Sequence, residues 1–548
     1  MKKLIFPILF LFAVSLLYAM PPMPGSGLTH DGSIFEDDEL YSYSARTLSL
    51  NRSSGSSSAK SSALAGTTGS KTILVILAGF SDYGFNSGSA SSAQTHNVAY
   101  YTNLLQGASG LTMKKYYHDQ SRGLLDLSFK VVGGPSYTSA NGYAYYGANE
   151  DGRRGNDILP GHLVYEMLKI ASTDPELAGV DLDNCTVIIV HAGPGEEVGG
   201  VSPDWIWSHR SSLSERKSKE AGTLPVIDPV TVQGKVFDDY LIVPEYNAWH
   251  GIYEATIGVF CHEFGHVLGL PDAYDTTGAT SGVGQWSLMG GGSWGSVGRA
   301  GVPPGSDPAP FMGWELILLG WIDEAQIATA PGTSSHSFTD INSADKVYTV
   351  KLADDQFLVL EGRAKNMSGS GLCSLEKGLL ITQLHMGILR DYWPRNKIND
   401  TSYRPHAAMV VEAKAANYKT NGLGNLWQAD STNNRFTTTA LFRSDTLTSI
   451  SPSGTAAAAS GFLLGALAAW YRGRKKLCAI LAVIALAAVI STGCSISSSG
   501  GGTYDSGPNT NYYTSTSNVH SKTGDSGITI YDIKVNEDGS GSFTVKKE

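Results

Sequence analysis

The stretch from His262 to Asp272 constrains the fold and chemistry of this chain more than any other segment. Its sequence is HEFGHVLGLPD, the pattern H-E-x-x-H-x-x-G-x-x-D. Residues four apart share one face of an α-helix, so His262 and His266 can direct their imidazoles at a single metal ion. Glu263 comes next to the first histidine, where a carboxylate can take a proton from a metal-bound water. The pattern therefore predicts a helix that carries a catalytic metal site.

The residues after this helix suggest how a third ligand reaches the metal. Gly269 can adopt a left-handed conformation and end the helix, which would bring Asp272 back as an oxygen ligand. Three protein ligands and one open position are typical of a catalytic zinc rather than a structural one. Spacing favours Asp272, but Asp275 and the distant Glu361 are alternative third ligands. Asp275 would also suit a turn or a cap.

Several segments on both sides of the motif resemble one family of enzymes. They are residues 73–77, 80–82, 116–117, 121–123, 187–197, 207–209, 243–246, 286–290, 319–321, 357–363 and 378–381. Together with the metal motif, they resemble the immune inhibitor A type of secreted metallopeptidase, a metzincin-like group. The similarity covers roughly residues 72 to 415. It implies zinc-dependent endopeptidase cleavage of proteins outside the cell, and it gives Met289 a packing role beneath the metal.

The apolar pattern predicts an α+β chain. Strands are expected at 73–78, 187–190, 348–352, 357–360, 379–384 and 408–411, and helices near 96–106 and 161–171. We therefore expect a zincin-like metallopeptidase catalytic domain at 72–335. An appended β-rich domain is expected at 336–450, where short apolar runs alternate with Gly, Asp and Asn turns.

The N-terminal segment indicates export. Residues 1–19 combine a basic start, an apolar core and a small residue, Ala19, at the expected cleavage position, as secretory signal peptides do. Residues 20–71 include a Ser/Gly run and little periodic apolar pattern, which is typical of a flexible leader or a propeptide.

The C-terminal segments are unusual for a soluble enzyme. Residues 451–494 hold two Ala-rich apolar runs around the basic residues 472–476, which predicts a hydrophobic hairpin or a sorting or membrane anchor. Two buried core helices are the alternative interpretation. Residues 495–548 form a Ser/Gly-rich tail with one weak strand near 527–535. The protein is thus expected to be extracellular or at the cell surface, attached to the membrane by its C-terminal part.

Other side chains give weaker signals. His191 ends a predicted strand. Either this strand binds extended substrate by edge pairing, or the histidine is hydrogen-bonded locally. His209 and Glu245 lie in family-like segments without a derivable role. Tyr274 or Tyr246 is a conceivable oxyanion stabiliser, although neither is expected individually.

Composition limits the partners and cofactors. The net charge is −10 and basic residues cluster only at 472–476, which argues against nucleic acid as a partner. Three cysteines in the soluble part (Cys185, Cys261 and Cys373) are expected to be small core residues with at most one disulfide. A structural calcium ion at the Asp-rich turn 181–184 is an unproven option, because solvated turns of this kind are usually empty.

The sequence thus predicts a secreted or surface-tethered zinc endopeptidase that hydrolyses extracellular proteins by zinc-activated water, with Glu263 as general base and acid. The alternative is a catalytically inactive surface adhesin or binding protein built on a protease fold. The presence of both histidines and Glu263 favours the enzyme, because an inactive protein needs no base. An exopeptidase with a closed cleft is a weaker option. Cleavage specificity, activation and oligomeric state are not indicated.

Overall fold

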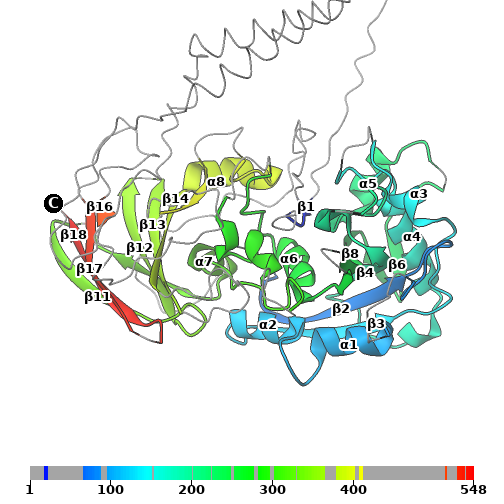
Figure 1. Cartoon of the computed structure of the whole chain (residues 1–548), viewed down its shortest axis with the longest axis horizontal. Coiled ribbons are helices and arrows are strands. Elements are labelled where there is room, and N and C mark those ends of the chain that lie inside the picture. Colours follow the sequence, from blue (N-terminus) through cyan, green and yellow to red (C-terminus); the bar gives the residue numbers. More distant parts are fainter. Residues whose placement is uncertain are drawn as a thin grey trace, which may run out of the picture.

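The computed structural model describes residues 18–21, most of 64–411, 513–514 and 528–547. The gaps are 65, 88–94, 151–153, 200, 224, 249–251, 277–281, 296–301, 329, 354, 365–377, 401–405 and 537. Two lobes lie side by side (Figure 1). One is a sheet with helices on both faces, the other consists of two β-sheets, and helices α6 and α7 lie between them.

The first lobe is built on a seven-stranded mixed sheet of order β1-β5-β8-β4-β2-β3, with β9 paired to β8. Its strands are β1 (Tyr18–Ala19), β2 (Gly69–Ala78), β3 (Leu125–Val132), β4 (Thr186–Pro194), β5 (His209–Ser212), β8 (Asp239–Ala248) and β9 (Ile252–Glu254). The four strands β3, β2, β4 and β8 run parallel. Strand β5 is antiparallel to β8, and β1 is antiparallel to β5.

Strand β2 is buried on both faces, as a central parallel strand should be. Ile73 and Val75 join the core that also holds α1, α2 and α6, whereas Leu74 and Ile76 join the core with α4. The helices of this lobe are α1 (Val98–Gln106), α2 (Met113–Gln120), α3 (Tyr143–Gly147), α4 (Pro160–Ala171) and α5 (Leu213–Lys219). The strands predicted at 73–78 and 187–190 and the helices predicted near 96–106 and 161–171 are confirmed.

The second lobe contains a five-stranded sheet of order β10-β12-β13-β14-β15 and a four-stranded sheet of order β11-β18-β17-β16. The strands are β10 (Asp323–Ile327), β11 (Gly332–Phe338), β12 (Lys346–Ala353), β13 (Gln356–Arg363), β14 (Gly378–His385), β15 (Ala408–Val410), β16 (Tyr513–Thr514), β17 (Ile528–Val535) and β18 (Gly541–Lys547). Apolar side chains from both sheets share one core. The strands expected in the β-rich region are thus present.

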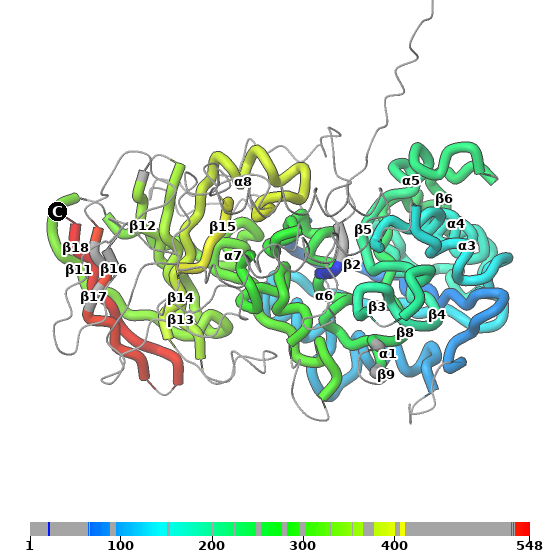
Figure 2. The backbone as a smooth tube through the Cα atoms, turned by 45° about the horizontal axis from the view of Figure 1, so that its top comes forward, coloured from blue at the N-terminus to red at the C-terminus, as the bar shows by residue number. Residues whose placement is uncertain are grey.

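The weak strand expected near 527–535 is confirmed as β17, but the tail at 495–548 contains two further strands, β16 and β18. Strand β18 pairs along all of β11, from Gly332 opposite Lys547 to Phe338 opposite Gly541. Figure 2 shows these strands in red beside β11, at the end of the molecule farthest from α3 and α5. Alternate apolar residues such as Phe543 and Val545 are buried in the core between the sheets. Because the pairing partner lies some 200 residues upstream, the local Ser/Gly composition did not indicate it.

The two lobes share a hydrophobic core. It includes Ile73 and Val75 of the first lobe, Phe264 of α6, and Phe357 and Leu380 of the second lobe. The remaining elements are α6 (Ile257–Val267), α7 (Gly313–Leu319), α8 (Met386–Tyr392), β6 (Val230–Val232), β7 (Lys235–Phe237) and the short helices η4 (Pro175–Leu177), η5 (Glu196–Val198), η6 (Gly284–Trp286), η7 (Gly291–Trp294) and η9 (Trp393–Arg395). Helix α6, which carries the metal motif, is therefore packed from both sides.

Several predicted segments lie outside the described residues. They are residues 1–17 of the signal peptide, most of the leader at 20–71, the hydrophobic segments at 451–494 and Cys373. In the part of the chain that is described, no helix has the length and apolar character needed to cross a membrane.

Candidate metal centre

Helix α6 carries both histidines of the motif on one face. The ring centroids of His262 and His266 are 4.8 Å apart, and both side chains are buried. The helix ends as expected, because Gly269 has a φ of 96°, in the left-handed region. Its backbone N–H donates to the carbonyl oxygen of His266 (2.9 Å), and the N–H of Leu270 donates to that of Gly265 (3.1 Å). This turn directs the chain back towards the histidines.

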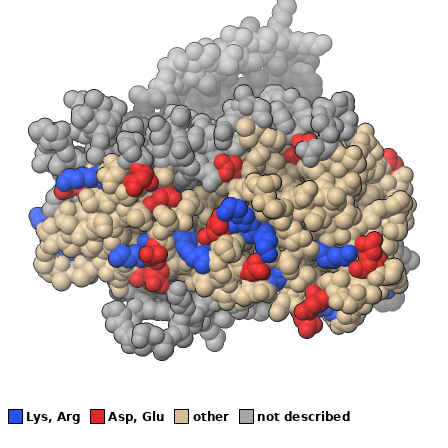
Figure 3. Space-filling view, turned by 90° about the horizontal axis from the view of Figure 1, so that it is seen from below, with Lys and Arg blue, Asp and Glu red and all other residues tan. Residues whose placement is uncertain are grey.

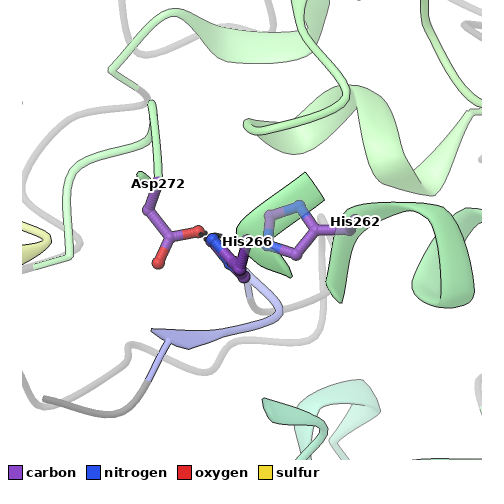
Figure 4. Close-up of side chains that lie close together, drawn as sticks. All are labelled: His262, His266 and Asp272. Atoms are coloured by element: carbon purple, nitrogen blue, oxygen red, sulfur yellow. Dashed lines mark ion pairs between the residues drawn. The ribbon is translucent and has the colours of Figure 1, made fainter. Parts of the chain in front are cut away.

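Asp272 completes a group of three candidate ligands (Figure 4). Its Oδ1 lies 3.1 Å from Nε2 of His262 and 3.4 Å from Nε2 of His266. The three ligand atoms lie within 4.8 Å of one another. Among the residues that the structure describes, this is the one such group found, and neither Asp275 nor Glu361 belongs to it. The carboxylate of Glu361 instead pairs with Arg363 and accepts the backbone N–H of Gly313.

The second nitrogen of each imidazole is held by a backbone carbonyl. Nδ1 of His262 lies 2.9 Å from the carbonyl oxygen of Leu288, and Nδ1 of His266 lies 2.8 Å from that of Leu270. A carbonyl can only accept, so the proton is assigned to Nδ1 and Nε2 is left as a lone-pair donor. Sequence reasoning did not identify these two partners, because a backbone carbonyl has no signature in the sequence.

The charges of the group suit a cation. Burial would raise the pKa of Asp272, but the facing imidazoles of His266 and His262 hold it well below its ordinary value. Burial lowers the pKa of His266, which favours the neutral ring that a metal requires. Nε2 of His262 and Oδ1 of Asp272 are buried, and the contacts of Oδ1 with the Nε2 atoms of His262 and His266 lie within the group itself. Two neutral imidazoles and one carboxylate fit a catalytic zinc ion.

Glu263 lies beside this group and is buried. Burial and the like charges of Asp272 and Glu197 raise its pKa well above the ordinary value, and a backbone contact with Met20 opposes the shift. No described side chain hydrogen-bonds its carboxylate. The group is therefore available to exchange a proton, and a cation bound nearby would favour its charged form.

The floor of the site is a buried turn at residues 286–289. The sulfur of Met289 packs against Gly265 of α6, in line with the packing role that the family resemblance implies. The backbone N–H of Met289 donates to Oγ of Ser287 (2.8 Å), and that hydroxyl donates to Glu315 of α7 (2.7 Å). Arg363 of β13 donates to the carbonyl oxygen of Trp286 (3.0 Å). The second lobe thus supports the turn whose Leu288 carbonyl orients His262.

Residues 18–21 lie along strand β5, which contacts helix α6. β1 pairs with β5, and the N–H of Met20 donates to the carbonyl oxygen of Ser208 (3.1 Å). Two indole N–H groups also bind this segment. That of Trp207 donates to the carbonyl oxygen of Met20 (2.9 Å), and that of Trp294 donates to the carbonyl oxygen of Pro21 (2.8 Å). Met20 is fully buried. The backbone edge of β5 is therefore already paired in this structure.

The edge-pairing interpretation of His191 is wrong. β4 lies between β8 and β2, so it has no edge open to a substrate. Nδ1 of His191 instead lies 2.9 Å from the carbonyl oxygen of Ala192, and the ring is fully buried near Trp205. His209 lies on the edge strand β5, where its Nδ1 contacts the Trp207 carbonyl oxygen (2.7 Å) and its Nε2 contacts the Tyr240 hydroxyl (3.1 Å).

The remaining candidates have mainly local partners. Glu245 of β8 bonds to Nδ1 of His96 (2.8 Å) and accepts the backbone N–H of Gly193 (2.9 Å), so it connects the segment before α1 to the end of β4. The ring of Tyr246 packs against that of His96, with the two ring centroids 5.0 Å apart. Tyr274 is closer to the metal group, with its ring 6.4 Å from that of His262, and burial together with the charge of Asp272 raises its pKa. Cys185 and Cys261 are free thiols.

The two buried histidines of the sheet predict a loss of stability in acid. Burial lowers the pKa of His191 to about 4 and that of His209 to about 3, against an ordinary value of 6.5. The unfolded chain therefore binds more protons below pH 6.5, so the stability that each neutral ring provides is lost as the pH falls from 6.5 towards 4. The slope is at most about 1.4 kcal/mol per pH unit for each histidine.

The measurement is the free energy of unfolding between pH 4.5 and 8, compared with that of His209→Gln. We expect the variant to lose less stability than the parent protein on acidification. If the free energy of unfolding changed equally with pH in the two proteins, His209 would not be a neutral side chain with a lowered pKa.

Comparison with known proteins agrees with this geometry. Residues 182–316 match the family described as immune inhibitor A peptidase M6, catalytic domain. The chain is 33% identical over 251 residues to the pre-pro-metalloprotease PrtV of Vibrio cholerae serotype O1. It is 30% identical over 305 residues to immune inhibitor A of Bacillus thuringiensis subsp. alesti. These matches confirm the resemblance expected from the sequence, and they support a peptidase that uses a metal.

The matches cover only parts of the proteins. The match to PrtV covers 40% of this chain and 26% of PrtV. The match to immune inhibitor A covers 48% of this chain and 41% of that protein. The chain therefore spans well under half the length of these relatives, and the activity and substrates of the whole protein are proposals.

Proposed function

We propose that this chain, which resembles peptidase M6 over its catalytic segment, is a zinc-dependent endopeptidase acting on extracellular proteins. The proposal rests on one observation above all. Three buried ligand atoms, from His262, His266 and Asp272, converge beside a buried carboxylate, Glu263, that no side chain in the described part of the chain hydrogen-bonds. A buried group of this kind is costly unless a cation binds it. The zincin-like class of the catalytic domain is part of the same proposal.

The mechanism assigns one role to each side chain. Zinc, when bound, supplies a Lewis acid that lowers the pKa of a coordinated water to about 7 and polarises a carbonyl group. His262 and His266 provide neutral nitrogen ligands, and Asp272 provides a negative oxygen. Glu263 takes a proton from the attacking water and then delivers it to the leaving amine.

The environment of Glu263 suits this exchange. Its pKa is raised by burial and by the charges of Asp272 and Glu197, so the carboxyl group holds an acquired proton firmly. A cation bound nearby would favour the carboxylate, which is the form that accepts a proton.

Strand β5 supports binding of extended peptide. It is the outermost strand of the sheet apart from β1, and it contacts α6. Substrates of extended conformation commonly pair with such an edge. Because residues 18–21 occupy it here, we infer that this segment must leave before a substrate binds. Cleavage of the predicted signal peptide after Ala19 would remove the paired residues Tyr18 and Ala19, and only Met20 and Pro21 of the segment would remain.

A shortened chain is expected to be more active than a longer one. A protein that begins at residue 25 lacks the segment on β5, whereas one that begins at residue 20 keeps Met20 and Pro21. A tethered segment has a high effective concentration, so its removal should raise kcat/KM for a short peptide by about tenfold or more. Both proteins should have equal metal content, and each is compared with its Glu263→Gln form. Equal rates would show that residues 20–24 do not obstruct the site.

Export and membrane attachment belong to this proposal. The signal peptide predicted at 1–19 and the anchor predicted at 451–494 would place the enzyme outside the cell and at its surface. The domain division at 20–71, 72–335 and 336–450 is proposed on the same basis.

A structural calcium ion finds no support among the described residues, because Oδ1 of Asp181 accepts the backbone N–H of Asp183 in a local turn.

The inactive-adhesin alternative is disfavoured by the same site. A protein that only binds a partner needs neither a metal nor the neighbouring Glu263.

The charge argues against nucleic acid as a partner, since the net charge is −10 and the face in Figure 3 mixes basic and acidic side chains.

Metal removal and cleavage of unfolded casein test the proposal. The purified full chain is assayed as prepared, after a chelator, and after zinc is restored, and bound metal is measured in each sample. We expect cleavage to disappear with the metal and to return with zinc. Well-folded protein that binds no zinc, or that cleaves equally without it, would refute the proposal.

A further inference from the structure

The two carboxylate oxygens of Asp272 have different partners. Oδ1 faces the two histidines, at 3.1 and 3.4 Å from their Nε2 atoms. Oδ2 accepts a hydrogen bond from Nδ2 of Asn396. The backbone N–H of Asp272 donates to Oδ1 of the same asparagine side chain (2.6 Å). One amide therefore binds both the side chain and the backbone of the third candidate ligand.

Asn396 belongs to a different part of the chain from the metal motif. It follows η9, 124 residues after Asp272 and beyond the segment 182–316 that matches the peptidase family. Its side chain is almost fully buried, and its φ of 52° is left-handed. Asparagine tolerates that conformation better than most residues with a side chain. The backbone geometry and the amide chemistry thus both suit asparagine at this position.

A second asparagine holds the same segment without touching a candidate ligand. Nδ2 of Asn399 donates to the carbonyl oxygen of Ala273 (2.7 Å), and its Oδ1 accepts the N–H of Ala408 at the start of β15 (3.0 Å). The segment after η9 is therefore anchored both to the chain after α6 and to the five-stranded sheet. Asn399 provides a natural control for the effect of anchoring alone.

We propose that Asn396 is the positioning residue of the metal centre and that the second lobe completes the site through it. This inference rests on the proposed function. With Oδ2 held by the amide, the carboxylate can rotate little, and Oδ1 presents its lone pairs to the metal as a single-oxygen ligand. Because an amide does not ionise, it can donate to Oδ2 without competing for the cation. Partners of this kind commonly change metal affinity by about 10- to 100-fold.

The experiment measures zinc affinity in the full chain. Asn396→Gly removes the amide and keeps a residue that adopts left-handed φ without strain. Asn396→Asp keeps the size and the acceptor for the backbone N–H, but it places a second carboxylate opposite Oδ2. Asn399→Ala is the matched control. Each protein is titrated with zinc against a chromophoric chelator, its cobalt form is examined by visible absorption, and the melting temperature of the metal-free form is recorded.

We expect Asn396→Gly and Asn396→Asp to bind zinc about 10- to 100-fold more weakly than the parent and to show an altered cobalt spectrum. Asn399→Ala should lower the melting temperature but leave the zinc affinity within about threefold, since it contacts no ligand. Parent-like affinity and spectrum in both Asn396 variants would overturn the inference. An equal loss of affinity in Asn399→Ala would also overturn it, because anchoring alone would then explain the effect. A parent chain that binds no zinc would instead refute the proposed function.

Discussion

Replacing Glu263 with glutamine is expected to lower the rate of peptide hydrolysis by about a thousand-fold or more while the metal stays bound. Glutamine has the size of glutamate but cannot take a proton from water or return one to the leaving amine. General acid–base catalysis contributes roughly 10²–10⁴-fold, and Glu263 serves both halves of the reaction. None of the three candidate ligand atoms comes from Glu263, so their arrangement should be unchanged.

The measurement is kcat/KM for a peptide substrate together with zinc content and the melting temperature. Removal of a group whose pKa is raised by burial and by the like charges of Asp272 and Glu197 should leave the folded protein at least as stable near neutral pH. A loss of activity that is accompanied by loss of zinc would assign Glu263 to the metal rather than to proton transfer. Substantial residual activity with full zinc occupancy would show that another group is the base.

Replacing Asp272 with asparagine is expected to weaken zinc binding by at least about a hundred-fold. The variant retains the shape of the side chain but loses the negative charge that faces the two imidazoles. A neutral amide oxygen is a poor zinc ligand compared with a carboxylate. A direct ligand should also matter more than the partners that orient it, whose loss costs about 10- to 100-fold.

Asp275→Asn is the matched control for this prediction. Asp275 is also buried and lies three residues further along the chain, but it does not belong to the group of ligand atoms. Its replacement should change zinc affinity by no more than a few-fold. Competition titration of both variants against a chelator makes the comparison. If Asp275→Asn released the metal and Asp272→Asn did not, the third ligand would have to be reassigned.

The metal motif was predictable from the sequence because its geometry is local. The four-residue spacing of His262 and His266 places them on one helical face in any α-helix. Gly269 is the residue type that most readily adopts the left-handed turn observed after the helix. The apolar runs of β2 and β4 likewise indicated buried strands, because parallel central strands are apolar on both faces.

Other features depended on which segments meet in space. The sequence leaves three candidates for the third metal ligand, namely Asp272, Asp275 and Glu361. The structure disfavours Glu361, because its carboxylate forms an ion pair with Arg363. The strand-end position of His191 in the sequence allows a role in substrate binding, but the structure places β4 inside the sheet, between β8 and β2. The pairing of residues 18–21 with β5 could not be predicted from the sequence, because backbone hydrogen bonds require no particular side chains.

The sequence by itself determined the helix, the two histidines, the neighbouring glutamate and the turn towards Asp272. Only the tertiary structure decided that the carbonyl groups of Leu288 and Leu270 contact the imidazoles, that Asn396 binds Asp272, and that the C-terminal strands pair within the second lobe. The physical reason is the range of the interactions. Helix periodicity and glycine turns act over a few residues. The bond between Asn396 and Asp272 spans 124 residues and exists only when both lobes have folded against α6.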